Sequence, residues 1–233
     1  MEQLYVDKDY IYQKLSRLFG HIPPFMHASV MDAIRVMRYR RKEIIYNIGE
    51  YTSEFMFLID GKAKIFREGV SGRRQILRIV TQGQHFGYEP LLTDEAHQNT
   101  AMACEDCIIA RIPMTTIDEL LHSNLRIANV VITTLAKELV ATERQLLNLT
   151  QKHMRGRVAD SLLMLRKACG TCEDGKTINI RITRQDIADM SNMNTANAIR
   201  TLSEFSAEGI IMIANRMIAI IDEERLKKIS RLG

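Results

Sequence analysis

Two pairs of cysteines stand at a spacing that suits metal binding or disulfide exchange. They are Cys104 with Cys107 and Cys169 with Cys172, and a Cys-x-x-Cys spacing lets two thiolates meet one zinc ion or iron–sulfur cluster. Cys107 opens the apolar run CIIARI and is expected in the core, whereas Cys169 and Cys172 end a helix before an Asp-Gly turn. No basic cluster stands beside either pair to favour the thiolates. We expect ordinary thiols, with metal or redox sensing as the alternative.

The other reactive residues show no catalytic arrangement. The sequence has no glycine-rich phosphate loop before a helix, no nucleophile motif and no HExxH-type helix. Its 6 histidines are scattered without a ligand pair at helical spacing, although a haem ligand among them stays open. We therefore predict that the protein is not an enzyme and has no metal site.

Polar residues that interrupt an amphipathic helix point to a different chemistry. In ITRQDIADMSNMNTANAIRTLSEF, residues 182–205, apolar side chains recur at helical spacing on both sides of residues 191–195. Small side chains at the start of a helix can approach the edges of DNA bases, where bulky apolar ones would clash. The restarted helix presents Thr195, Ala196, Asn197 and Arg200. The apolar positions are Ile187, Met190, Ile199, Leu202 and Phe205.

The flanking residues predict that this break is a turn between two helices. Thr183 and Asp186 have the spacing of a capping box, which starts the first helix. Asn192 tolerates the left-handed conformation that ends a helix, and Asn194 is a favourable N-cap for the second helix. The pattern predicts a helix-turn-helix, with a plain helical hairpin as the alternative.

The segments around the two helices complete this domain. After them, IIMIANRMIAIID (residues 210–222) predicts a β-hairpin with residues 214–216 at its tip, which we call the wing. Before them, residues 155–168 predict a helix, and TINIRI (residues 177–182) alternates isoleucine with polar residues and predicts a strand.

A long heptad pattern lies between this domain and a β-rich part. Residues 38–113 hold short β-forming runs bounded by glycines, which predicts a compact antiparallel roll or sandwich, and residues 9–37 predict short helices. The heptad seam, spaced by four and three residues, consists of Ala128, Ile132, Leu135, Leu139, Thr142, Leu146 and Leu149. So regular a seam favours a parallel homodimer over a helix packed on its own domain.

Composition and charge fit a cytoplasmic protein that binds nucleic acid. The chain has 233 residues, 46% hydrophobic and 26% charged, no run that could span a bilayer, and no signal-peptide character at its start. Residues 1–151 carry 18 basic and 18 acidic side chains, so the net charge of +4 comes from residues 152–233. A basic C-terminal domain suits DNA, although it could also be a basic surface without a partner.

These motifs together resemble the Crp/Fnr regulators. ITRQDIADM, the helix from Asn194 to Arg200 and the hairpin are similar to their winged helix-turn-helix, and RRKEIIYNIGEYTSEFMFLIDGKAKIF is similar to the start of their cyclic-nucleotide-binding-type roll. The resemblance implies an α+β fold: an antiparallel, jelly-roll-like effector domain over residues 1–121, a dimerisation helix over 122–152, and a winged helix-turn-helix over 153–233. The partners that it implies are double-stranded DNA with a palindromic operator, a second copy of the chain, and RNA polymerase. It implies no association with a membrane.

The resemblance also implies which residues contact the DNA backbone. Thr183 and Gln185 match residues that hold phosphates at the start of the first helix. Asn197 matches a hydroxyl-bearing backbone contact, and Arg216 matches a basic residue of the wing.

Base contacts follow from the same resemblance. Arg200 stands where the family presents an arginine to a guanine, whose O6 and N7 one guanidinium spans. Asn194 opens the recognition helix. Thr195 and Ala196 replace the arginine and glutamate of a cyclic-AMP-binding member, so the operator should differ in its bases.

The matching effector pocket departs from the pattern of cyclic-nucleotide binders. Where that pattern has glycine-glutamate for the ribose, this chain has Gly87 followed by Tyr88, with Glu89 one position later. Residues 99–101, Asn-Thr-Ala, replace the arginine-serine-alanine that holds the cyclic phosphate. A charge-assisted hydrogen bond contributes about 1.5–3 kcal/mol, so Asn99 in place of arginine should weaken binding about tenfold to a hundredfold.

The ligand of this pocket is therefore unknown, and no cofactor is predicted. Thr100 and Thr142 are further candidates for effector contacts, and Thr142 could equally bond to its own helix. The iron–sulfur branch of the family has N-terminal cysteines, whereas the first cysteine here is Cys104. We expect a homodimeric transcription regulator that does not respond to cyclic AMP; the alternative is a redox or metal sensor that uses the cysteine pairs or haem.

Overall fold

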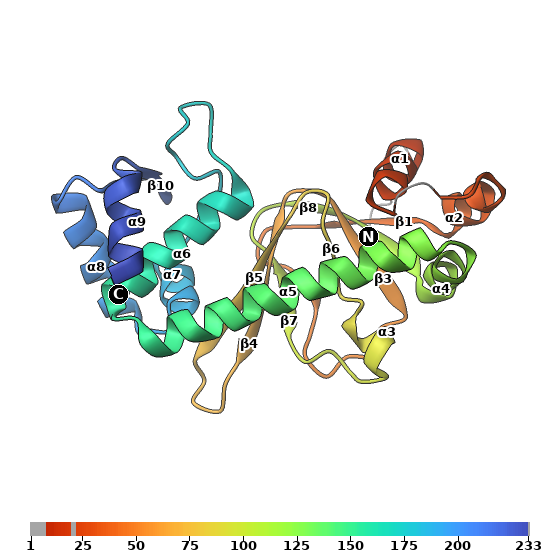
Figure 1. Ribbon diagram of the computed structural model, residues 1–233, viewed down its shortest axis with the longest axis horizontal. Coiled ribbons are helices and arrows are strands. Elements are labelled where there is room, and N and C mark those ends of the chain that lie inside the picture. Colours follow the sequence, from red (N-terminus) through yellow and green to blue (C-terminus); the bar gives the residue numbers. More distant parts are fainter. Residues whose placement is uncertain (1–7, 20–21, 233) are drawn as a thin grey trace. The chain divides into compact units, whose positions relative to one another are not determined.

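The computed structural model describes residues 8–19 and 22–232 (Figure 1). The chain divides into two compact units. One consists of residues up to 64 together with 80–141, and the other consists of residues 65–79 together with those from 142 onward. The first unit is β-rich and the second is mostly helical, which agrees with the predicted α+β fold.

Two four-stranded sheets form the β-roll. The first has the order β1-β8-β3-β6, and each neighbouring pair is antiparallel. The second has the order β2-β7-β4-β5, and residues 65–79 of the β4–β5 hairpin fall in the second unit. The strands of the first sheet are β1 (Arg35–Tyr39), β3 (Glu54–Asp60), β6 (His85–Phe86) and β8 (Cys107–Pro113). The strands of the second are β2 (Ile44–Tyr46), β4 (Lys62–Glu68), β5 (Arg74–Thr81) and β7 (Thr100–Ala103).

Short helices pack on the first sheet. They are α1 (Lys8–Phe19), a 3-10 turn (Pro24–Met26), α2 (His27–Ala33) and α4 (Met114–Ser123). Ile11, Leu15 and Phe19 recur at a spacing of four, so α1 buries one stripe against residues such as Phe55, whose ring lies 5.8 Å from that of Phe19. Burying each such side chain contributes about 1.5–3 kcal/mol. The predicted helical stretch over 9–37 was too long, because residues 35–37 pair with β8 as part of β1.

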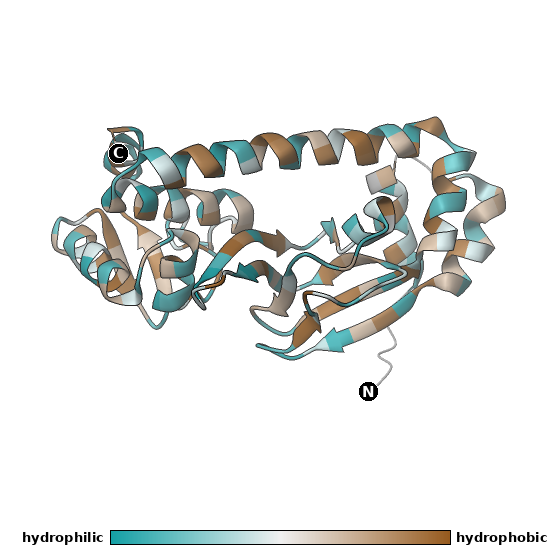
Figure 2. Cartoon of the chain, turned by 90° about the horizontal axis from the view of Figure 1, so that it is seen from below, coloured by the Kyte–Doolittle hydropathy of each residue, from teal (hydrophilic) through white to brown (hydrophobic). Residues whose placement is uncertain are grey.

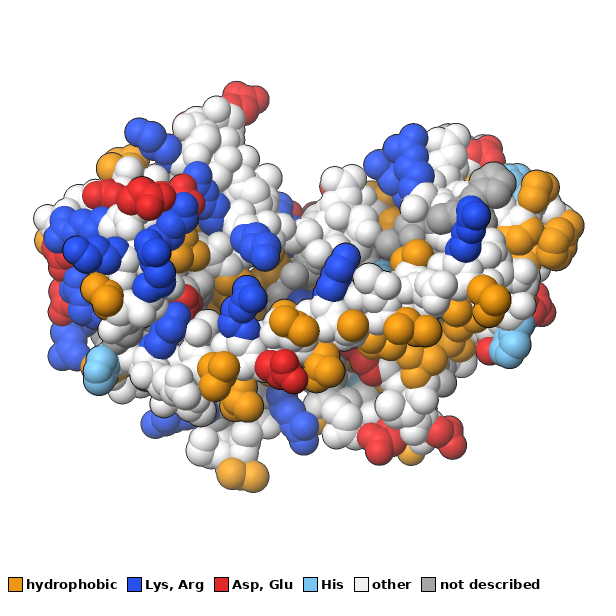
Figure 3. Space-filling model, viewed as in Figure 1, with side chains coloured by type: hydrophobic (Ala, Val, Ile, Leu, Met, Phe, Trp, Pro, Cys, Tyr) orange, Lys and Arg blue, Asp and Glu red, His pale blue; other side chains and the backbone are white. Residues whose placement is uncertain are grey.

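Helix α5 (Leu125–Gln151) confirms the predicted long helix but leaves its seam uncovered. Of the described residues of α5, Ile127 alone is buried, whereas Ile132 is 62% and Leu139 61% exposed. Hydrophobic residues recur along the helix in Figure 2, and Figure 3 shows hydrophobic side chains on its surface. An uncovered apolar row at heptad spacing on one chain is what a second helix would bury.

The second unit gathers the C-terminal helices around one small core. These helices are α6 (Met154–Cys169), α7 (Arg184–Met190), α8 (Thr195–Ala207) and α9 (Glu223–Leu232). The wing is formed by β9 (Ile211–Ala214) and β10 (Met217–Ile220), as predicted. The buried side chains include Val158, Leu162, Leu165, Ile187, Leu202, Phe205, Ile218 and Leu226.

The strand predicted at residues 177–182 does not form, although its three isoleucines are buried. Ile178, Ile180 and Ile182 are all buried, but only two isolated bridges form there, Thr171 with Ile178 and Thr177 with Ala219. The N–H of Ile180 donates to the carbonyl of Ile178 at 2.8 Å. This i→i+2 turn interrupts the extended backbone that a ladder needs.

We predict that the seam holds two chains together. Leu135→Asp combined with Leu139→Asp should turn a dimer into a folded monomer, because both side chains are exposed on the single chain and two facing carboxylates would repel. Light scattering after gel filtration at micromolar concentration measures the mass.

A matched control is Val140→Asp, which changes a residue whose exposure (54%) lies between those of Leu135 (36%) and Leu139 (61%) and which stands next to the seam but outside its a and d positions. This variant should stay dimeric. A wild-type protein that is monomeric at micromolar concentration would contradict the prediction.

Candidate nucleic-acid interface and effector pocket

The turn between α7 and α8 has the local geometry predicted from the sequence. Thr183 Oγ1 accepts from the N–H of Asp186 at 3.0 Å, and the Asp186 carboxylate accepts from the N–H of Thr183, which completes the capping box. Asn192 is left-handed at φ 48°. Asn194 caps α8 by accepting from the N–H of Asn197 at 2.8 Å. Each cap contributes about 1 kcal/mol, so these polar residues define where the two helices stop and start.

Helix α6 holds this turn in place through polar contacts. The hydroxyls of Ser161 and Ser191 lie 2.8 Å apart and both residues are buried, Ser191 completely. Arg157 Nη1 donates to the carbonyl of Asn192 at 3.2 Å, which satisfies a backbone group that the left-handed residue turns away from its helix. The buried pair of serine hydroxyls favours one arrangement of the chain over others.

One face of α8 packs inward and the other stays open. Ala198, Leu202 and Phe205 are buried. The guanidinium of Arg155 lies 4.8 Å from the centre of the Phe205 ring and also pairs with Glu204 at 2.9 Å. The sequence-based placement of Ile199 on the apolar face was wrong, because Ile199 is 45% exposed. The buried spacing of 198, 202 and 205 turns position 199 toward the open face. That face carries Ala196, Ile199, Arg200 and Ser203.

Most of the predicted DNA contacts come together on this surface. Gln185 on α7 accepts from the Thr195 hydroxyl at 2.5 Å, and Arg200 lies beside Asn197, with Nη2 3.5 Å from Oδ1. Arg216 is exposed in the wing turn, where it and Asn215 both have positive φ.

Asp189, which accepts from Gln185 Nε2 at 2.7 Å, was not predicted from the sequence. Its spacing of four residues from Gln185 was a usable signal.

The residues that match the effector pocket enclose a tyrosine of the protein itself. A Cβ on Gly87 would stand 3.2 Å from Cε1 of Tyr46, and the Tyr46 hydroxyl donates to Asn99 Oδ1 at 2.8 Å. The Tyr46 ring therefore spans the space between Gly87 and Asn99. His97 stacks on this ring at 3.7 Å, and burial lowers the pKa of His97, which favours its neutral form.

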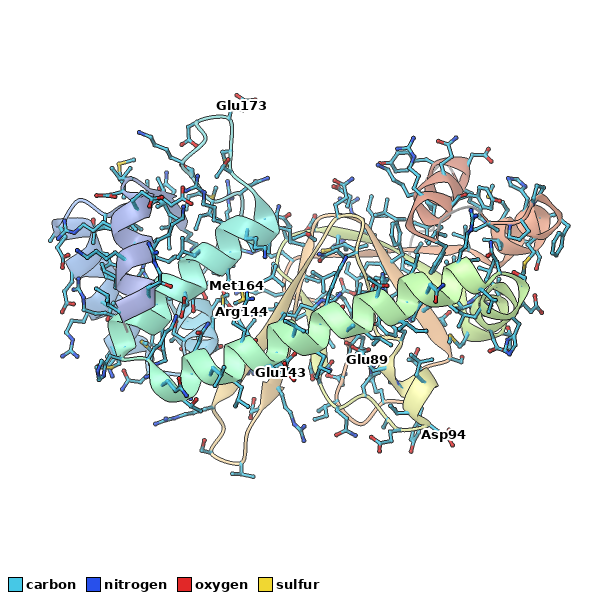
Figure 4. The ribbon with its side chains drawn as sticks, viewed as in Figure 1. Glu89, Asp94, Glu143, Arg144, Met164 and Glu173 are labelled. Carbon is cyan, nitrogen blue, oxygen red and sulfur yellow. The ribbon has the colours of Figure 1, made fainter. Side chains whose placement is uncertain are left out.

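Two of the remaining pocket candidates, Tyr88 and Thr100, make hydrogen bonds within the fold. Tyr88 is buried in the hydrophobic core, and its hydroxyl donates to Glu138 on α5 at 3.2 Å. Thr100 Oγ1 accepts from the N–H of Ile48 at 3.1 Å. Glu89 opens α3 (Glu89–Thr93) and is labelled in Figure 4, and Thr142 is exposed on α5.

Comparisons with known proteins agree with this pair of domains. A model of the cyclic nucleotide-binding domain matches residues 36–124, and a model of the Crp-like helix-turn-helix domain matches residues 156–229. The chain belongs to the Crp/Fnr family. As a member of this family, it is a transcription regulator with a Crp-type DNA-binding domain.

Relatives and solved structures of the family cover nearly the whole chain. The chain is 23% identical to a CRP-like cAMP-activated global transcriptional regulator of Mycobacterium tuberculosis, over 92% of this chain and 96% of that protein. It is 27% identical to the transcriptional regulator LdrP of Thermus thermophilus, over 82% of this chain and 94% of that protein. FixK2 of Bradyrhizobium japonicum has the same fold, with a TM-score of 0.76, 23% identity, and coverage of 84% of this chain and 96% of that chain.

The cysteines of this family member fall into one buried and three half-buried thiols. Cys107 is fully buried, and its Sγ donates to the carbonyls of Lys62 at 3.1 Å and Glu105 at 3.2 Å, as expected for a core residue. Burial raises the pKa of Cys107 to about 11. Cys169 ends α6, and Cys172 lies in the following loop, next to Glu173 (Figure 4).

Neither a metal-binding cluster nor a membrane-spanning helix is found among the described residues. Across 8–19 and 22–232, no three histidine, cysteine or acidic side chains converge as a metal site would require. Over the same part of the chain, no helix has the length and apolar character to cross a bilayer.

Cyclic AMP should not bind at physiological concentration. Asn99 brings no charge to a phosphate, and the Tyr46 ring occupies the space between Gly87 and Asn99. Isothermal titration of the purified chain with cyclic AMP should give no heat of binding up to about millimolar ligand, the range in which weak sites would appear. A cyclic-AMP-binding family member titrated in the same buffer serves as the positive control, and a micromolar affinity for this chain would contradict the prediction.

Cys107 should be the last thiol to react. In the native protein at pH 8, a thiol reagent should modify at most Cys104, Cys169 and Cys172, and Cys107 should react only after unfolding in guanidinium. Because its pKa rises from 9.0 to about 11 on folding, stability should fall as the pH rises through this window. Cys107→Ala should leave unchanged the number of thiols that react in the native protein. Four thiols that react equally fast would show that Cys107 is not buried.

Proposed function

We propose that this protein binds an inverted-repeat operator as a homodimer, with one α8 in the major groove of each half-site. The open face of α8 carries the proposal, because its residues are small except for one arginine and one isoleucine. The N-terminal residues of a recognition helix approach base edges, and two half-sites of a dimer lie about one helical turn apart. The seam of α5 provides the pairing that an inverted repeat requires.

Within this proposal, Arg200 and Ile199 contact bases. A guanidinium spans O6 and N7 of one guanine, and an exposed apolar side chain favours the methyl group of a thymine. Asn194 and Ala196 precede these residues at the start of α8. The side chain of Ala196 is too short for a long bidentate contact with a base. The neighbouring base pairs should therefore be less selective than in a member with arginine and glutamate at positions 195 and 196.

Other residues of the interface contact phosphates. Thr183 and Gln185 stand at the start of α7, Asn197 on α8, and Arg216 at the wing tip. Phosphate contacts fix the register of the protein on DNA but carry no sequence information. The excess of basic residues after residue 151 adds to this sequence-independent attraction.

Control of DNA binding does not depend on cyclic AMP in this proposal. Tyr46, with His97 stacked on it, lies between Gly87 and Asn99, so in this proposal an effector acts elsewhere or displaces this ring. We further propose that this regulator acts in the bacterial cytoplasm, where DNA and RNA polymerase are found, and that RNA polymerase is one of its partners.

Arg200→Ala and Arg216→Ala should have different effects. Loss of Arg200 should cost about 1–3 kcal/mol per half-site and relax preference at one guanine. Loss of Arg216 should weaken all sequences alike and lower the salt dependence, because a phosphate contact releases counterions. The operator is first selected from a random DNA pool, and binding constants are then measured for each variant against each single-base change at fixed salt.

Lys176→Ala, in the loop between α6 and α7, serves as a control for the loss of one exposed positive charge. If Arg200→Ala lowers affinity for every sequence equally, Arg200 contacts the backbone. Selection of no inverted repeat would overturn the proposed mode of binding.

A further inference from the structure

A chain of hydrogen bonds connects α7 to the first residue of α8. Gln185 Nε2 donates to Asp189 Oδ1 at 2.7 Å, and Thr195 Oγ1 lies 2.5 Å from Gln185 Oε1. Asp189 is 5% exposed, whereas Gln185 is exposed and Thr195 half-buried. The chain therefore begins at a buried carboxylate and ends at a residue on the surface that faces DNA in the proposed function.

The carboxylate determines the direction of every hydrogen bond in this chain. Asp189 Oδ1 accepts from Gln185 Nε2, so the amide group of Gln185 that faces Asp189 is the NH₂. The carbonyl oxygen of the same amide then faces Thr195, and because it cannot donate, the Thr195 hydroxyl must donate to it. The single proton of that hydroxyl is thus engaged within the protein. Only the lone pairs of Thr195 Oγ1 remain for an outside partner.

A hydroxyl that can only accept distinguishes between bases. In the major groove, adenine N6 and cytosine N4 carry amino groups that donate, whereas guanine and thymine present the acceptors O6, N7 and O4. An oxygen that faces an acceptor without a proton between them loses a hydrogen bond and is repelled. An unconstrained threonine would lack this selectivity, because its hydroxyl can rotate and donate or accept.

We propose that Thr195 is a specificity-determining residue that accepts a hydrogen bond from an exocyclic amine of adenine or cytosine, and that Asp189 is its positioning residue. Asp189 acts through Gln185 and does not touch the base. The second N–H of Gln185 Nε2 stays available for a phosphate, so the two roles of Gln185 are compatible. This inference rests on the proposed placement of α8 in the major groove.

The test measures base preference at each operator position for full-length variants. The wild type should prefer adenine or cytosine over guanine or thymine at one position per half-site by about two- to tenfold, as expected for one hydrogen bond. Thr195→Val keeps the shape and removes the hydroxyl, so it should abolish this preference and leave the guanine opposite Arg200 unaffected. Thr195→Ser keeps the hydroxyl and should retain the preference.

Asp189→Asn tests the positioning role. An asparagine can donate as well as accept, so the amide of Gln185 can turn over, and the Thr195 hydroxyl becomes free to donate to O6 or O4. This variant should accept all four bases at the same position without a change elsewhere. Glu224→Gln is the control for replacing a carboxylate by an amide, since Glu224 is exposed on α9. Circular dichroism and thermal unfolding verify that each variant is folded. If Asp189→Asn does not fold, the comparison of Thr195→Val with Thr195→Ser tests the proposal alone.

The outcomes separate this inference from the function it rests on. If the wild type selects an inverted repeat and Arg200→Ala relaxes one guanine, but Thr195→Val changes no preference, only this inference is overturned. A wild-type preference for guanine or thymine at the position that Thr195→Val alters would overturn it as well. If no inverted repeat is selected and Arg200→Ala relaxes nothing, the proposed function itself has failed.

Discussion

The buried contact between the Ser161 and Ser191 hydroxyls is the constraint on which the proposed DNA-binding surface depends. It ties the end of α7 to α6, and Arg157 binds the carbonyl of the next residue, Asn192. The Ser161 hydroxyl also donates to the carbonyl of Arg157 at 3.0 Å, so the two buried hydroxyls and this carbonyl form one small network. Because the turn has one favourable arrangement, α8 starts at one place and exposes one face.

The β-roll keeps the fold of its family, and Tyr46 lies between two residues, Gly87 and Asn99, that match the family's effector pocket in sequence. Gly87 permits this packing because any side chain there would meet the Tyr46 ring at 3.2 Å. Tyr88, the neighbour of Gly87, bonds to Glu138 of α5, so this part of the β-roll is linked to the helix that carries the seam. Related folds thus share an architecture whose ligand chemistry depends on a few side chains.

Local sequence was enough wherever a short-range interaction decides the structure. The capping box of Thr183, the left-handed Asn192 and the cap at Asn194 depend on residues within three or four positions, and the structure has all of them. The long helix α5 and the buried Cys107 also followed from periodicity and composition. Such features carry their cause in adjacent residues, so no knowledge of distant contacts was needed.

The order of elements, the turn, the wing and the heptad helix all follow from the sequence, whereas packing decides which side chains are available. Ile199 looked apolar and inward, yet the positions of Ala198 and Leu202 against the core turn it outward. Tyr46 meets Asn99 from 53 residues away, and the Thr195–Gln185 bond joins two different helices. The physical reason is that hydrogen bonding and burial depend on distances between segments, and those distances exist only once the core has formed.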